Sequence, residues 1–403
     1  MALCFPAMRS PNIRYLPGVD HLRGAAALLI VIYHGVHILS HRELYQAPFD
    51  PNPNKWLETY NILWSPIIEG HTAVALFMVL SGFIFTFGAR GSEIGYWAFM
   101  RNRVLRIFPL YLLLLVVGIY VYPQNFSLGG LFQDVGFMAN LPGIMQLDPF
   151  GAMFWAIAIE FQFYFVFPFL LLFSRRYGLK YLLGIIALFT LFRVGGYLLG
   201  ADIVNLSYMT IVGRIDQFAL GMLAGALYQA DRPADRRALL AFVLSSLAAF
   251  LSLHGFHLLG GYPTEAFYKL FWPTFEGTFW ALVIVTYLPV SRCVPRLLSR
   301  PLIWIGTVSF SIYLLHIVFL TILVEKGVYF SLSFHSAPLN ALANSVAILV
   351  PLTLAGSALT YNLIEKPFLD LRRRYKIRPI PSTSGLEVPG LSSTTHREAQ
   401  SLK

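Results

Sequence analysis

The hydrophobic positions of this chain are grouped in long continuous runs, and most polar and charged positions lie between the runs. Many runs have 17 or more predominantly apolar residues, which is enough to cross about 30 Å of hydrocarbon as an α-helix. Strands of a membrane β-barrel would instead alternate polar and apolar positions over short segments. The pattern therefore predicts an all-α, polytopic membrane bundle with about ten spans, at 24–40, 72–89, 107–122, 152–173, 179–199, 212–229, 238–258, 273–290, 303–323 and 339–363.

The positive charges between these runs are distributed unequally. If the N-terminus is cytoplasmic, the inner segments carry about six times as many Lys and Arg residues as the outer ones. Because basic residues collect in cytoplasmic loops, both termini are predicted to be cytoplasmic. We expect one membrane domain over 1–370, followed by a tail over 371–403. That tail is first basic and then rich in Ser, Thr and Pro, which predicts disorder.

Composition narrows the class of protein further. Of the 403 residues, 57% are hydrophobic and 12% are charged, about half the charged fraction of a soluble domain. The net charge of +10 follows the membrane distribution just described, so we expect no nucleic-acid partner. Two isolated cysteines, Cys4 and Cys293, predict neither a disulfide framework nor a metal site. The first long run lacks a cleavage pattern behind it, so no cleaved signal peptide is expected.

Arg23 and His34 are the first ionisable pair within an apolar run. Eleven helical positions separate them by about 16 Å along the axis, and they project within about 20° of one face. Ionisable groups within a membrane are costly and usually face a cavity or a partner. A neutral imidazole can accept a proton near pH 7, as a general base for a hydroxyl must. A hydrogen bond between helices would be the structural alternative for His34.

A second pair, Arg103 and Arg106, lies one turn apart at the start of the third predicted span. It is predicted to face the same cytoplasmic side as Arg23. Guanidinium groups there could bind a phosphate-rich donor through paired hydrogen bonds. The neighbouring Arg90 and Arg101 are explained by membrane orientation alone.

Four further spans carry isolated polar groups. Glu160 lies in the middle of the fourth span with Tyr164 nearby, and a structural pairing with an arginine is as plausible as a chemical role. Arg214 and Asp216 lie just inside the predicted outer surface, within reach of Arg193; they could neutralise each other or hold a polar acceptor. The ninth span carries a second deep histidine, His316, and the tenth ends at Glu365-Lys-Pro.

Together these residues resemble acyltransferase family 3, the bacterial integral-membrane O-acyltransferases. The matching pieces occur in the family's order over about 15–370. They are Arg23-x10-His34, Gly70…Phe77-Met-Val-Leu-Ser-Gly82, Arg103-x-x-Arg106-Ile-Phe-Pro-Leu-Tyr111, Trp155-x4-Glu160-x2-Phe163-Tyr164-x3-Pro168, Arg214-x3-Phe218-x2-Gly221, Ser311-Ile-Tyr-Leu-Leu-His316 and Glu365-Lys-Pro367.

The resemblance implies transfer of an acyl group, usually acetyl, from acyl-CoA loaded from the cytoplasm, with no permanently bound cofactor. It also implies a bacterial inner-membrane location, a need for the Arg-x10-His and Arg-x-x-Arg motifs, and a cell-surface polysaccharide, lipid-linked sugar or related glycan as acceptor. Polysaccharide-synthesis machinery is a further expected partner. Many members carry an appended extracytoplasmic esterase-like domain. We do not expect one here, because the sequence ends about 40 residues after the last predicted span.

The resulting hypothesis places the phosphates of acyl-CoA at Arg23, Arg103 and Arg106 and the thioester at His34. His34 would act as general base or would itself take the acyl group. Glu160 or Asp216 would orient the imidazole or bind sugar hydroxyls. Tyr164, Arg214 and His316 would contact substrate.

Two hypotheses compete with the interpretation of this protein as an enzyme. A transporter or flippase for an anionic or glycosylated lipid would also bury charges, although no internal repeat of the kind common in transporters is visible. A purely structural membrane protein would leave His34, Glu160 and His316 unexplained.

Overall fold

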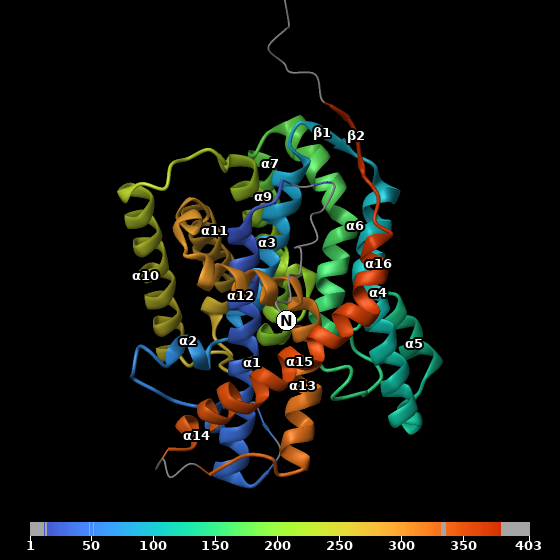
Figure 1. The fold of residues 1–403 in the computed structure, drawn as a ribbon, viewed down its shortest axis with the longest axis vertical. Helices are drawn as coiled ribbons and strands as arrows, with labels where there is room; N and C mark the ends of the chain where they lie inside the picture. The colour runs from blue at the N-terminus through green and yellow to red at the C-terminus, as the bar shows by residue number, and fades with distance from the viewer. Residues whose placement is uncertain (1–11, 13, 48, 51, 332–335, 380–403) are drawn as a thin grey trace, which may run out of the picture.

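The computed structural model describes residues 12, 14–47, 49–50, 52–331 and 336–379 of the chain (Figure 1). These residues are mostly helical, with one two-stranded sheet. The helices and strands are α1 (Pro17–Tyr45), α2 (Ser65–Ile68), α3 (Thr72–Ala89), β1 (Ser92–Ile94), α4 (Tyr96–Val121), α5 (Leu128–Val135), α6 (Phe154–Tyr177), α7 (Lys180–Leu198), α8 (Ile203–Tyr208), α9 (Ile211–Leu227), α10 (Arg236–Leu258), α11 (Trp272–Val290), α12 (Arg296–Thr307), α13 (Ser309–Glu325), α14 (Ala337–Asn344), α15 (Val350–Thr360), α16 (Lys366–Asp370) and β2 (Lys376–Pro379).

Every predicted span coincides with helical structure. The tenth is continuous from Ala337 to Asp370, because two five-residue π-helical segments join α14, α15 and α16. Within the described residues, seven helices are long and apolar enough to cross a membrane, or eight if one bent pair counts as a single span. The fold class is therefore an all-α membrane bundle. The number of ten spans and the cytoplasmic position of both termini stay predictions.

The ninth predicted span, 303–323, is not one straight helix. It is divided between α12 and α13, which meet at 73°. The bend follows from close packing of α12 on α1, because a Cβ atom at Gly24 would lie 2.6 Å from the carbonyl oxygen of Leu302. A Cβ atom at Gly306 would lie even closer to the carbonyl oxygen of Asp20. With α12 fixed in this way, the chain turns at Val308 and α13 runs along α1.

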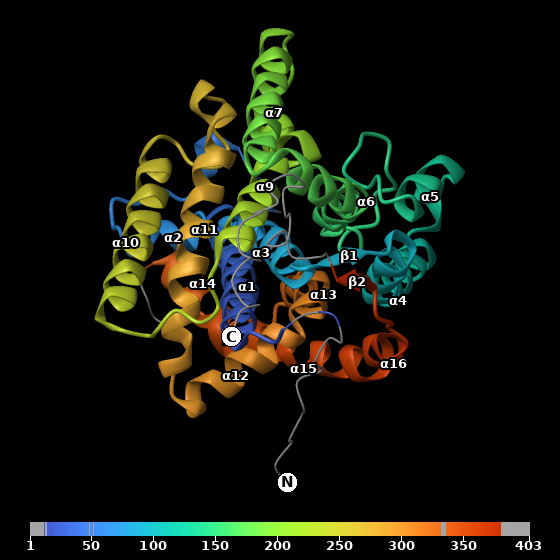
Figure 2. The same cartoon turned by 90° about the horizontal axis from the view of Figure 1, so that it is seen from above.

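Helix α1 occupies the middle of the molecule and packs against α3, α12, α13 and α14 (Figures 1 and 2). Helices α7 and α10 lie at the periphery (Figure 2). We call the end that holds β1 and β2 the strand end (Figure 1). α4 follows β1 in the chain, and Arg175 of α6 donates to the carbonyl oxygen of Ser92 in β1. Asn12, which precedes α1, accepts a hydrogen bond from the backbone N–H of Tyr375, next to β2. The start of the predicted tail forms β2 here and pairs antiparallel with β1. Its predicted disorder from residue 380 onward lies outside the described residues.

Helices α3 and α9 run in the same direction and touch at their backbones. A Cβ atom on Gly82 would collide with the carbonyl oxygen of Phe218, and one on Gly221 with that of Val79. Small residues permit such close contact between helices in a membrane. Both glycines belong to the motifs in the sequence, and their role in this fold is to bring α3 and α9 together.

Candidate functional site

A cavity of about 260 Å³ opens at the strand end of the bundle. Helices α1, α3, α4, α6 and α13 all contribute to its wall. Its charged lining residues are Arg14, Asp20, Arg23, Arg103, Arg106, Glu160 and Arg372. Burial, together with the charges of Arg106 and Arg103, lowers the pKa of Arg372 to about 10, so it still carries its charge at neutral pH. Positive charge outnumbers negative charge in the wall, and the cavity is suited to an anionic ligand.

Arg103 supplies a charge that the described residues do not neutralise with a carboxylate within 4.0 Å. Its guanidinium carbon lies 4.7 Å from the ring centroid of Phe85, 5.4 Å from that of Phe99 and 5.7 Å from that of Tyr164. These ring faces hold the cation electrostatically without using up its hydrogen bonds. Its Nε is buried and has no hydrogen-bond partner among the described residues. The Arg103 guanidinium is therefore held in place, and its N–H groups are still available to bind an anion.

Arg106, one turn later on α4, is already paired. Its Nη1 donates to Oε2 of Glu365 at 3.0 Å, and Ser311 donates to the other oxygen of the same carboxylate. Glu365 is fully buried, so the pair ties α4 to the C-terminal helical run and to α13. This contact gives the Glu365-Lys-Pro motif a structural role that the sequence did not reveal.

Arg23 and Glu160 reach the same cavity from α1 and α6. Arg23 donates to Oγ of Ser309 at 3.2 Å and lies 4.0 Å from Asp20. Glu160 accepts hydrogen bonds from Ser81 at 2.7 Å and from the hydroxyl of Tyr164. The three arginines that the sequence analysis expected at one end, Arg23, Arg103 and Arg106, thus line one cavity, and Glu160 and Tyr164 line it too.

His34 is paired with His316, which comes from α13. Nδ1 of His34 lies 3.0 Å from Nε2 of His316, and 3.1 Å from the carbonyl oxygen of Ile30. Nδ1 of His316 lies 3.0 Å from the carbonyl oxygen of Ile312. A carbonyl oxygen only accepts, so both Nδ1 atoms of the neutral rings carry hydrogen and Nε2 of His316 accepts from His34. This assignment leaves Nε2 of His34 with its lone pair free to accept a proton.

The histidine pair is next to the cavity rather than in its wall. Tyr313 lines the cavity, and its ring centroid is 5.9 Å from that of His316. Val74 of α3 also lines the cavity. The side chain that contacts the His34 ring nitrogen is therefore His316. Of the two predicted supporting acids, Glu160 uses Oε1 for Ser81 and Tyr164, and both oxygens of Asp216 bond Arg193.

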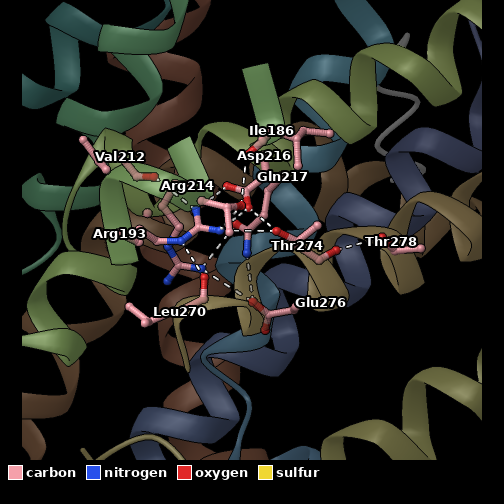
Figure 3. Close-up of polar contacts among 12 residues, drawn as sticks. Ile186, Arg193, Val212, Arg214, Asp216, Gln217, Leu270, Thr274, Glu276 and Thr278 are labelled. Atoms are coloured by element: carbon pink, nitrogen blue, oxygen red, sulfur yellow. Dashed lines mark hydrogen bonds and ion pairs between the residues drawn. The ribbon is translucent and has the colours of Figure 1, made fainter. Parts of the chain in front are cut away.

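Arg214 and Asp216 belong to a separate polar network between α7, α9 and α11 (Figure 3). The guanidinium of Arg193 makes two hydrogen bonds to Asp216, at 2.9 and 2.8 Å, and both side chains are fully buried. Thr274 also donates to Asp216, and Arg193 donates to the carbonyl oxygen of Leu270 at 2.6 Å. These contacts correspond to the mutual neutralisation that the sequence left open.

Arg214 makes the second ion pair of this network, at 3.6 Å from Glu276 (Figure 3). The same carboxylate accepts from Gln217 at 2.9 Å. Nε of Arg214 donates to the carbonyl oxygen of Tyr208 at 3.0 Å, which anchors α8 to α9. Neither Arg214 nor Asp216 lines the strand-end cavity.

A group of residues that the sequence analysis did not single out lies where α3 begins, at the end of this helix away from the strands. It is centred on Glu69, with His71 and His257 bonded to it. The available signal was a glutamate and a histidine flanking Gly70 at the start of the second apolar run. Within the described residues, no three or more His, Cys, Asp or Glu side chains are arranged to hold a metal ion.

Comparison with known proteins identifies the family of this chain. Residues 16–362 match the acyltransferase domain family. The chain is 28% identical to the exopolysaccharide production protein ExoZ of Rhizobium meliloti, over 79% of this chain and 93% of that protein. It is 24% identical to the peptidoglycan O-acetyltransferase OatA of Listeria monocytogenes over 77% of this chain, which spans about half the length of that relative. It is 23% identical to the putative acetyltransferase ORF330 of Acidianus two-tailed virus, over 78% of this chain and 86% of that protein. No solved structure matches the chain significantly.

The family match covers most of the chain, including α1, which carries Arg23 and His34, and α4, which carries Arg103 and Arg106. The helices that form the cavity wall are long and apolar, as a membrane protein requires. The chain therefore belongs to the acyltransferase domain family and is a membrane acyltransferase.

Proposed function

We propose that this protein transfers an acetyl group from acetyl-CoA to a hydroxyl of a cell-surface glycan, with His34 as the general base. The observation that carries the proposal is the arrangement along α1. An arginine-lined cavity lies at one end of the helix, and a histidine pair with a free ring nitrogen lies next to Tyr313, which lines that cavity. The names of the relatives, which refer to exopolysaccharide production and to peptidoglycan O-acetylation, support a glycan acceptor.

Arg23, Arg103 and Arg106 would hold the phosphates of the donor. Guanidinium groups bind phosphate oxygens through paired, charge-assisted hydrogen bonds, and Arg103 is held by aromatic faces with its hydrogen bonds still available. Arg23 and His34 are about 16 Å apart along α1. An extended pantetheine arm is of that length, so phosphates at the arginines would bring the thioester to the imidazole.

His34 would then act through Nε2. This nitrogen takes the proton of an acceptor hydroxyl while the hydroxyl oxygen attacks the thioester carbonyl. The carbon–sulfur bond breaks, the imidazolium returns the proton to the sulfur, and the products are the acetyl ester and CoA thiol. In this scheme His316 sets the tautomer of His34, the role for which the sequence suggested Glu160 or Asp216. Tyr164 holds Glu160 at the cavity wall.

The proposed membrane arrangement has the strand end in the cytoplasm of a bacterial inner membrane. The basic residues of α4 and of the segment after α16 support this orientation. Acetyl-CoA would enter from the cytoplasm, and the glycan would approach from the other end. Polysaccharide-synthesis enzymes are the natural suppliers of such an acceptor.

The test uses purified protein in lipid nanodiscs, acetyl-CoA, and surface glycan extracted from a strain that lacks the gene. CoA thiol is expected to be released only when the glycan is present. His34→Gln is expected to lower that rate by about 10²–10⁴-fold, the usual contribution of a general base. His21→Gln is the matched control, because His21 lies on the same helix but bonds Tyr287 and Ser299 outside the cavity wall.

Three outcomes discriminate between mechanisms. Equal activity in His34→Gln and wild type would rule out His34 as the base. A burst of thiol without acceptor, absent from His34→Gln, would indicate that His34 takes the acyl group itself. Movement of a glycolipid across the membrane with no thiol release would favour a transporter.

A further inference from the structure

The start of α3, away from the strands, contains a buried carboxylate with an unusually complete set of donors. Glu69 accepts hydrogen bonds from Trp56 Nε1 at 3.2 Å, His257 Nδ1 at 2.8 Å, His71 Nε2 at 3.1 Å and the backbone N–H of Tyr262 at 3.2 Å. Burial alone would raise the pKa of Glu69, but the hydrogen bonds from His257 and His71 outweigh it and hold the pKa at about 2. Glu69 is therefore an ionised acceptor held by four hydrogen bonds.

The two histidines on this carboxylate differ in their second ring nitrogen. Nε2 of His257 accepts the backbone N–H of Thr59 at 3.1 Å, so both of its nitrogens are used within the protein. Nδ1 of His71 has no hydrogen-bond partner among the described residues, although the residue is only 7% exposed. Because the other nitrogen donates to Glu69, Nδ1 carries the lone pair. A buried acceptor left in this state is costly unless a ligand uses it.

Aromatic rings surround His71. Their centroids lie 5.1–6.0 Å from that of the imidazole, and they belong to Tyr33, Tyr208, Phe256 and Tyr262. The hydroxyl of Tyr208 is also buried without a partner among the described residues, in a side chain that is 1% exposed. The guanidinium of Arg214 lies over this tyrosine ring, 4.7 Å from its centroid. Aromatic surface with a few separate hydrogen-bonding groups is typical of sites that orient a polar organic ligand.

This group lies beside the proposed reaction centre. The ring of Tyr33 contacts both histidines, with centroid distances of 4.7 Å to His34 and 6.0 Å to His71. Val74 of α3, three residues after His71, lines the arginine cavity. The donor's reactive end at His34 would therefore have the arginines on one side and His71 on the other.

We propose that Nδ1 of His71 and the hydroxyl of Tyr208 bind hydroxyl groups of the acceptor glycan. Glu69 is the positioning residue that fixes the His71 tautomer. This inference rests on the proposed function and adds to it the subsite that holds the acceptor. A sugar hydroxyl donates to His71 and another accepts from Tyr208, while the sugar face packs on the aromatic rings.

The experiment compares two histidines that share one carboxylate. His71→Gln and His257→Gln are assayed in nanodiscs at saturating acetyl-CoA, with surface glycan from the gene-deleted strain as the varied substrate. Loss of one hydrogen bond to the acceptor is expected to raise its KM roughly tenfold in His71→Gln. The KM for acetyl-CoA is expected to stay unchanged, and His257→Gln should keep the wild-type KM for the glycan.

Tyr208→Phe is a second test of the subsite that should leave folding intact, because the hydroxyl that it removes has no hydrogen-bond partner among the described residues. Its glycan KM is expected to rise about threefold or more. Equal effects of the two histidine variants, or a fall in kcat at unchanged glycan KM, would overturn the proposal. Binding of the same glycan without acetyl-CoA is measured in parallel. If wild type binds glycan but releases no thiol, the proposed function fails while the binding comparison still tests the subsite.

Discussion

Two arginine-rich regions of this protein use the same side chain for different purposes. In the network of Figure 3, the guanidinium of Arg193 donates two hydrogen bonds to the carboxylate of Asp216, and both groups are fully buried. In the strand-end cavity, Arg103 lies over three aromatic rings, without a carboxylate within 4.0 Å among the described residues. Arg106 combines both situations, because it lines the cavity and also pairs with Glu365.

The difference shows how to separate structural from functional charge in a membrane bundle. Charges within the bilayer are costly and are usually paired or directed at a cavity. In a buried ion pair the two charges neutralise each other and the hydrogen bonds hold helices together, as those of Arg193 do for α7, α9 and α11. A cation that has only ring faces around it keeps its hydrogen bonds for a ligand. Substitutions in the two regions should therefore affect different measurements.

The largest effect on stability is expected from Asp216→Ala. Removing one partner of a buried pair leaves Arg193 uncompensated, and the free energy of unfolding should fall by about 3–5 kcal/mol. Thermal unfolding of the purified protein measures this. Asp231→Ala is the control, because its pair with Arg14 is exposed and should be worth less than about 1 kcal/mol. Equal unfolding temperatures for the two variants would contradict a structural role for the Arg193–Asp216 pair.

Arg106→Ala should reduce both stability and donor binding. It leaves the buried Glu365 without its cation, for which we expect a loss of about 3 kcal/mol. The double variant Arg106→Ala/Glu365→Gln should recover most of this loss, because it removes the unpaired charge. It should not recover the KM for acetyl-CoA. Recovery of both would mean that Arg106 acts only through the fold.

Arg103→Ala should change donor binding with little change in stability. Loss of one charge-assisted hydrogen bond to a phosphate corresponds to about 1.5–3 kcal/mol, or roughly a 10–150-fold weaker affinity for CoA. The lost ring contacts should cost about 1 kcal/mol of stability or less. Arg101→Ala on the same helix is the matched control, since Arg101 does not line the cavity. Unchanged CoA affinity in Arg103→Ala would remove its phosphate-binding role.

A change in ionic strength should have the smallest effect of the four. It should change donor binding in the strand-end cavity but not the stability that the Arg193–Asp216 pair provides. The cavity opens toward solvent, where the screening length is about 10 Å at 0.1 M salt. The KM for acetyl-CoA should therefore rise a few-fold between 0.05 and 0.5 M NaCl. The unfolding temperature should hardly change, because salt does not reach the fully buried Arg193–Asp216 pair. A donor KM that is independent of salt would argue against electrostatic binding of the phosphates.

The positions of the helices followed from the hydrophobic pattern with few exceptions. The apolar runs had the length of a membrane span, and this property is local to each segment. The bend between α12 and α13 could not be predicted in this way. It depends on Gly24 and Gly306 meeting across two helices that are far apart in the sequence.

Part of the site also followed from the sequence. Arg23, Arg103 and Arg106 were expected at one end of the bundle, and all three line the strand-end cavity, together with Glu160 and Tyr164. Spacing within one helix fixes which residues share a face, and the charge distribution predicted a common end for Arg23, Arg103 and Arg106. Such information cannot show which partner a side chain finds on another helix.

By itself, therefore, the sequence determined a bundle of apolar helices, the end at which the arginines gather, and a histidine three turns along the first helix. Tertiary packing alone decided that His316 rather than an acid contacts His34, that Asp216 is closed by Arg193, and that Glu69 orients His71. The physical reason is that apolar length and charge sign are properties of single segments. A hydrogen bond between helices instead requires two side chains to meet within about 3 Å, which only the packed bundle specifies.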